Sequence, residues 1–187
     1  RFCGEYLALI LLSALGLMLM ASTRDLIPIY ISLELSSMSM YSLVAFLKEG
    51  HSSEAGIKYF LLGAIASAVL LFGIALIFGM TGTTSLGGIQ TAIIDNGLRE
   101  PALLLGMVLI IAGFGFKIAT VPFHMWVPDV YQGAPTSITA YLSVASKAAG
   151  FAVILRVFYT AFGSPSWVVN DWTLIFGVLA AVTMTVG

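Results

Sequence analysis

Two ionisable side chains lie near the centres of long apolar stretches. Glu34 is close to the midpoint of residues 26–47, and Lys147 is within a helical turn of the midpoint of residues 136–162. A charge at the centre of a bilayer costs ~2.5–3.5 kcal/mol on insertion scales, and such residues usually mark an ion pathway or a paired site. Both residues are therefore candidates for moving ions, with a structural ion pair between helices as the alternative.

Lys117 and His124 lie on either side of Pro122. On a straight helix, Lys117 would be near the far membrane surface, where its ammonium group reaches water. On a helix that breaks at Pro122, it would lie inside the protein beside unwound backbone and water, and the length of the segment favours this arrangement. Histidine titrates near neutral pH, so His124 is a candidate proton carrier, although a lone histidine near an interface is often only a satisfied polar residue.

Lys58 follows Glu54 by one helical turn, at the start of the apolar stretch 57–80. This spacing is that of an ordinary surface ion pair on a helix, and lysine also reaches water from the end of a span. The position of Lys58 alone does not distinguish a surface ion pair or a lysine that reaches water from a role in ion transfer. Gly63 and Ser67, one turn apart on the same stretch, are suited to close helix packing.

Other chemistries find no support in the residue pattern. No glycine-rich loop follows a strand, so no nucleotide site is expected. His51 and His124 lack the spacing of metal or haem ligands, and a single cysteine, Cys3, excludes an internal disulfide and a thiolate metal cage. We therefore expect neither a cofactor nor a metal in this chain.

These residues stand in a chain of 187 residues that is 59% hydrophobic and 9% charged, with a mean hydropathy of +1.03. Since a soluble domain carries about 25% charged residues, this composition cannot cover a surface that faces water. It excludes soluble, disordered, nucleic-acid-binding and secreted disulfide-rich classes, and it indicates an integral membrane protein. The chain opens at Arg1, stops inside an apolar run and has no signal peptide, so we expect a fragment of a longer subunit.

A helix that spans a bilayer needs about 20 apolar residues. The sequence therefore predicts an all-α, polytopic transmembrane helical bundle of about six spans with one broken helix, in a single domain over residues 1–187. The expected spans lie near residues 2–21, 26–47, 57–80, 101–121 (broken and continuing to 131), 136–162 and 172–187. Residues 86–94, within the longest polar interval, are expected to form a short interfacial helix.

The broken helix follows from length and from proline. Residues 101–131 are largely apolar over about 31 residues, or ~46 Å of helix, against a hydrocarbon core of ~30 Å. Pro122 and Pro128 both fall inside the segment, and each removes a backbone donor and disfavours helix in the residue before it. We expect a helix, a break near Pro122 and a short second half, an arrangement common at the ion sites of transporters.

A family resemblance rests on the same segment. Residues 116–136 read FKIATVPFHMWVPDVYQGAPT, which closely resembles the broken-helix motif of the antiporter-like subunits of respiratory complex I. The PFHxW core is shared with the multisubunit cation/proton antiporters. The continuation PDVYQGAP, the stretch SVASK at 143–147 and the stretch YISLEL at 30–35 resemble the N-type subunit, the bacterial counterpart of mitochondrial subunit 2. The resemblance covers essentially the whole chain.

The resemblance implies a fold and a set of site residues. Glu34 would be the mid-membrane glutamate paired with the broken-helix lysine, Lys117, while His124 and Lys147 would continue the relay. Lys58 matches a further lysine of the family. Family members have two inverted five-helix repeats followed by further helices, so the chain would be the first repeat plus the first helix of the second.

The implied function is that of a proton-translocating, non-redox subunit of an NADH–quinone oxidoreductase, with no catalytic redox site in this chain. NADH, FMN, iron–sulfur clusters and quinone would then bind elsewhere in the complex. The expected partners are the other membrane subunits and the lipid bilayer, in a bacterial cytoplasmic (inner) membrane, and not nucleic acid. Two alternatives stay open: a subunit of a multisubunit cation/proton antiporter, and a membrane scaffold whose ion pairs only lock helices together.

Overall fold

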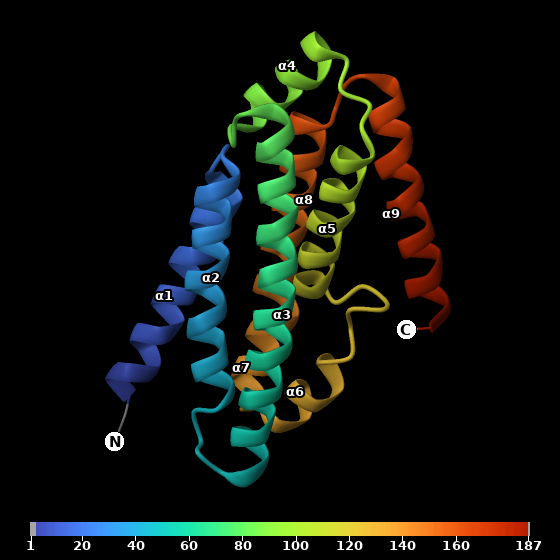
Figure 1. The fold of residues 1–187 in the computed structure, drawn as a ribbon. Helices are drawn as coiled ribbons and strands as arrows, with labels where there is room; N and C mark the ends of the chain where they lie inside the picture. Colours follow the sequence, from blue (N-terminus) through green and yellow to red (C-terminus); the bar gives the residue numbers. More distant parts are fainter. Residues whose placement is uncertain (1–2, 187) are drawn as a thin grey trace.

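The computed structural model describes residues 3–186, which form a helical bundle with no β-strand in that range, as the sequence predicts (Figure 1). Arg1, Phe2 and Gly187, which include the expected ends of the first and last spans, lie outside the described residues. The elements in chain order are α1 (Cys3–Ser22), α2 (Leu26–Val44), α3 (Gly50–Thr81), α4 (Leu86–Asn96), α5 (Pro101–Ile118), α6 (Val127–Gly133), α7 (Thr136–Tyr141), a π-helical turn (Leu142–Ser146), α8 (Lys147–Ala161) and α9 (Ser166–Val186).

Five helical stretches within residues 3–186 are long and apolar enough to cross a membrane: α1, α3, α5, the continuous stretch Thr136–Ala161 and α9. α2 does not reach the same hydropathy, because its serines and Glu34 interrupt the apolar residues. It is nevertheless 19 residues long, against 18 for α5. α2 also runs beside α1 and α3 in the bundle (Figure 1), so with it the number of spans agrees with the predicted value of about six.

α3 extends beyond the apolar stretch that the sequence marks out. It begins at Gly50 and has 32 residues, which is ~48 Å of helix against a hydrocarbon core of ~30 Å. Its first turns lie at the end of the bundle where α6 and α7 lie, and α6 packs against them (Figure 1). A search for apolar residues cannot detect this extension, because helical backbone bonds continue into water where the side chains become polar. Glu54 belongs to this extension, and Lys58 lies at the start of the apolar stretch, one helical turn further along α3.

The break after α5 has the form that its proline dictates. α5 ends at Ile118, whose carbonyl would have accepted the N–H that Pro122 lacks. Ala119 then adopts the left-handed conformation at φ 61°, and the N–H of Thr120 donates to the Gly115 carbonyl at 3.0 Å. The peptide between Val121 and Pro122 is cis. Non-helical backbone thus separates α5 from α6.

The short helix α6 packs against the first part of α3. The Trp126 ring at its N-terminal end stacks on Tyr59 of α3, with centroids 4.6 Å apart and 15° between the planes. Trp126 Nε1–H also donates to the Phe116 carbonyl at 3.0 Å, which ties α6 to the last turns of α5. At the other end of α6, Gly133 lies so close to α3 that a Cβ there would be 2.8 Å from the His51 carbonyl oxygen. These contacts hold α6 at both of its ends.

Candidate functional site

Lys117 lies in the last turn of α5, inside the bundle, and is only 3% exposed. Its Nζ donates to Ser37 Oγ at 3.0 Å and to Ser36 Oγ at 3.3 Å, both on α2. The sulfur of Met40 is 3.8 Å away. Its side chain is thus buried against α2, and of the two arrangements left open by the sequence the structure has the interior one.

Glu34 is half-buried on α2 and accepts a hydrogen bond from Ser67 Oγ of α3. Among residues 3–186 no direct ion pair joins Glu34 to Lys117, unlike the pairing that the resemblance implies. The reason is one of register. Lys117 reaches Ser37, about 4.5 Å further along the α2 axis than Glu34, while Ser67 takes up the carboxylate. Both charged groups are therefore held by neutral hydroxyls.

A small cavity lies between α2, α3 and α5 at this site. Its volume is about 10 Å³, and its lining includes Ser37, Ser67 and Lys117. This is close to the smallest space that holds one water molecule, and the lining offers the polar partners that such a water needs.

His124 and Lys147 lie beyond the break. His124 is partly buried in the segment before α6, and its Nδ1 is buried with no hydrogen-bond partner within residues 3–186. Lys147 is the first residue of α8 and lies directly after the π-helical turn. Its Nζ is 5.7 Å from the centre of the Tyr131 ring of α6. His124 and Lys147 are thus near opposite ends of α6.

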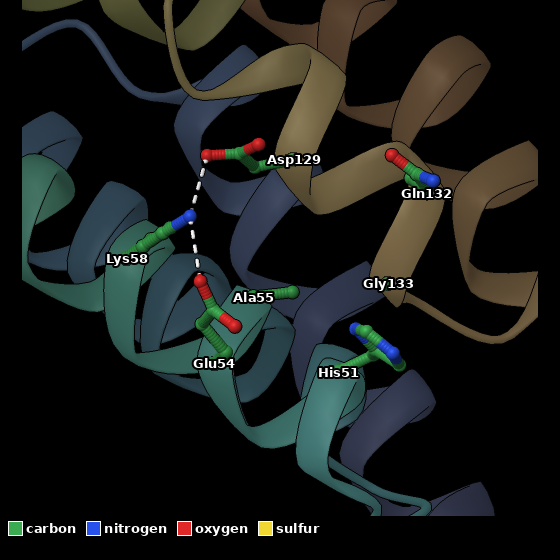
Figure 2. Close-up of a pocket in the computed structure, with 7 residues that line it drawn as sticks. All are labelled: His51, Glu54, Ala55, Lys58, Asp129, Gln132 and Gly133. Atoms are coloured by element: carbon green, nitrogen blue, oxygen red, sulfur yellow. Dashed lines mark hydrogen bonds and ion pairs between the residues drawn. The ribbon is translucent and has the colours of Figure 1, made fainter.

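Lys58 is placed differently from the other predicted site residues. Figure 2 shows its ammonium group between two carboxylates, 2.8 Å from Glu54 Oε1 and 2.9 Å from Asp129 Oδ2 of α6. The three side chains are 44%, 62% and 52% exposed. They border an open pocket of about 360 Å³ lined by His51, Glu54, Ala55, Lys58, Asp129, Gln132 and Gly133. The Glu54–Lys58 contact is the surface pair that the spacing allows, and Asp129 adds a link between α3 and α6.

The structure therefore brings Glu34 and Lys117 into one serine-lined site and places His124 and Lys147 at α6. It leaves Lys58 at the exposed end of α3, and the described residues contain no continuous hydrogen-bonded chain through all five. The sequence did not single out Ser36, Ser37 and Tyr131, and it treated Ser67 as a packing residue. The concentration of serines in α2, an otherwise apolar helix, was the available signal for the first two.

Comparison with known proteins agrees with the fold and the motif. The family model described as "NADH:quinone oxidoreductase/Mrp antiporter, TM" matches residues 23–187. A curated relative, NADH-quinone oxidoreductase subunit N of Dehalococcoides mccartyi, is 54% identical over 192 residues, which covers 100% of this chain and 40% of the relative. The chain thus spans about two fifths of the length of this relative.

Solved structures give the same result for the fold. A chain of respiratory complex I from Thermus thermophilus with bound aureothin matches with a TM-score of 0.75 and 43% identity, over 84% of this chain and 34% of that one. A chain of the Mrp complex from Dietzia sp. matches with a TM-score of 0.73 over 83% of this chain and 29% of that one. Its identity is 24%, so this second likeness concerns the fold alone.

Proposed function

The chain belongs to the NADH:quinone oxidoreductase/Mrp antiporter transmembrane family, and from this premise we propose that it is part of a proton-translocating membrane subunit of an NADH–quinone oxidoreductase. Its relative at 54% identity is a subunit N, which supports this assignment within the family. The membrane would be a bacterial cytoplasmic membrane, because that relative is bacterial. The partners would be lipid and the other membrane subunits of the complex.

The observation that carries the proposal is the setting of Lys117. Its ammonium group is buried at the end of an interrupted helix and is held by two serine hydroxyls. An ammonium in direct contact with a carboxylate would be fixed in its charged form, whereas neutral hydroxyls also accommodate the neutral amine. Lys117 can therefore both bind and release a proton. Glu34 on α2 is near enough to influence whether Lys117 is protonated.

The electrostatic interaction between Glu34 and Lys117 is similar in size to the energy needed to move a proton against the membrane potential. At an effective dielectric near 20, two unit charges ~6 Å apart interact by about 3 kcal/mol. Moving one charge against a potential of 100 mV costs about 2.3 kcal/mol. A change in the separation of Glu34 and Lys117 can therefore drive a proton away from Lys117, by way of His124 and water to Lys147. Lys58 would act outside this buried line, at the exposed end of α3.

Redox chemistry is assigned to other subunits in this proposal. NADH, FMN, iron–sulfur clusters and quinone would bind there, and this chain would contribute proton transfer alone. The alternative of a scaffold with locked ion pairs is less favoured, because Glu34 and Lys117 are each bonded to serines within the described residues.

A subunit of a multisubunit cation/proton antiporter is the second candidate. It is favoured by the PFHxW core at residues 122–126 and by the shared fold with the Mrp complex. Purification of the native complex separates the two: flavin and iron–sulfur subunits accompany the chain in the first case and are absent in the second.

Lys117→Ala, made in the full-length subunit of the assembled complex, tests the proposal. We expect normal assembly on native gels and loss of NADH-driven proton uptake into inside-out membrane vesicles. Lys48→Ala is the matched control, since Lys48 is an exposed lysine in the connection between α2 and α3. Wild-type proton uptake from a fully assembled Lys117→Ala complex would overturn the proposal.

A further inference from the structure

Lys147 occupies an irregular point of its helix. The π-helical turn Leu142–Ser146 ends directly before it, and α8 begins at it. Single π-helical turns inside α-helices are frequent at functional sites. Within residues 3–186 no carboxylate lies in ion-pair range of Lys147. Its ammonium group instead lies 5.7 Å from the centre of the Tyr131 ring, a distance at which the negative ring face attracts a cation.

Tyr131 is held by packing. Its ring meets the Trp126 ring edge to face, with centroids 6.0 Å apart and an angle of 78° between the planes. Trp126 in turn donates to the Phe116 carbonyl at the end of α5. The Tyr131 hydroxyl oxygen is buried and makes no hydrogen bond to any described residue. The orientation of the ring toward Lys147 thus comes from its aromatic neighbour, and the hydroxyl is not needed to hold it.

These contacts run from the buried Lys117 to the partly buried Lys147. Phe116 precedes Lys117 on α5, Trp126 directly precedes α6, and Tyr131 near the end of α6 faces Lys147. A shift of the half-helix at the break would therefore also move the Tyr131 ring relative to Lys147. Packed aromatic rings transmit such a shift because an interior at native density does not absorb it.

We propose that Tyr131 is a positioning residue of the relay, whose ring face stabilises the protonated form of Lys147 and fixes its ammonium group at the junction of α6 and α8. This inference deepens the proposed function and rests on it. A ring suits a transfer site because its attraction for the cation is moderate, whereas a buried carboxylate in direct contact would hold the proton on the lysine.

The test varies the electrostatics of the ring at nearly constant shape. In the assembled complex, position 131 is replaced by phenylalanine and then by phenylalanines carrying one, two and three ring fluorines, which progressively withdraw electrons from the ring face. Tyr131→Phe should keep most of the proton uptake, because the ring face is retained. Each added fluorine should lower the rate of NADH-driven proton uptake, down to about two- to thirtyfold below Tyr131→Phe.

Two control variants distinguish the role of Tyr131 from the proposed function. Tyr159→Leu removes a 65% exposed tyrosine of α8 and should leave assembly and proton uptake unchanged. Proton uptake that is the same for all fluorinated variants would overturn the role of Tyr131, and so would loss of uptake in Tyr131→Phe itself. Lys117→Ala measured beside them tests the proposed function: if it stops uptake while the fluorine series is flat, only the role of Tyr131 fails.

Discussion

Gly133→Ala should displace the half-helix α6 from α3. A Cβ at position 133 would lie 2.8 Å from the His51 carbonyl oxygen and in close contact with the Ala55 methyl group. Both neighbours belong to α3 and move only with its backbone, so α6 must shift. Overpacking of this kind typically costs about 1–3 kcal/mol, and the shift would also move Tyr131 near the end of α6.

The assay is thermal stability of the assembled complex together with NADH-driven proton uptake, and we expect both to fall. Gly79→Ala, on α3, is the control for a glycine-to-alanine change, because a Cβ at Gly79 meets nothing within 4 Å. It should be neutral or stabilise by about 0.5–1 kcal/mol. Ala55→Gly added to Gly133→Ala removes one of the two obstructions and should restore part of the loss. A Gly133→Ala complex that matches Gly79→Ala in both measurements would refute the close packing of α6 on α3.

Two further perturbations test the contacts that hold the broken segment. The Val121 N–H donates to Thr183 Oγ1 of α9 at 3.1 Å. Thr183→Val should therefore destabilise the complex by about 1–3 kcal/mol in thermal unfolding, while Thr183→Ser should not. Equal stabilities of the two variants would show that this hydrogen bond does not stabilise the complex. The Lys58–Asp129 pair is half-exposed. Asp129→Asn should therefore change the stability of the complex by less than about 1 kcal/mol at low salt and by still less at high salt. A larger loss of stability that does not depend on salt would contradict this exposed ion pair.

The break and the burial of Lys117 could be predicted because both follow from local chemistry. An apolar segment too long for one span, with Pro122 inside it, has to break, and a lysine just before the break has to lie in the protein. The α2 helix was equally predictable, although its end at Val44 was not. The apolar pattern continues past the residue at which the backbone leaves the helix.

The partners of the charged groups could not be predicted, because they come from other helices. Lys58 meets Asp129 from 71 residues away, and Lys117 meets Ser37 from 80 residues away. Local spacing contains no information on which turn of α2 faces α5. The resemblance pointed to Glu34 as the partner of Lys117, but the register of the two helices places the lysine one turn further along. The contact between Tyr131 and Lys147 could not be predicted for the same reason, because only packing turns the Tyr131 ring toward Lys147.

The most direct test of the central claim is proton uptake by a Lys117→Met complex, measured with its resistance to heat. Methionine has a similar length and no charge, and Lys117 has no direct carboxylate partner among residues 3–186 that the change would leave unpaired. The substitution removes the attraction between Lys117 and Glu34, but it also removes the desolvation cost of the buried ammonium, and because these two effects oppose each other we expect a small net change in stability. We predict a complex that assembles and withstands heat like the wild type but takes up no protons on NADH addition. A complex that pumps normally, or one that falls apart, would contradict the assignment of Lys117 to proton transfer.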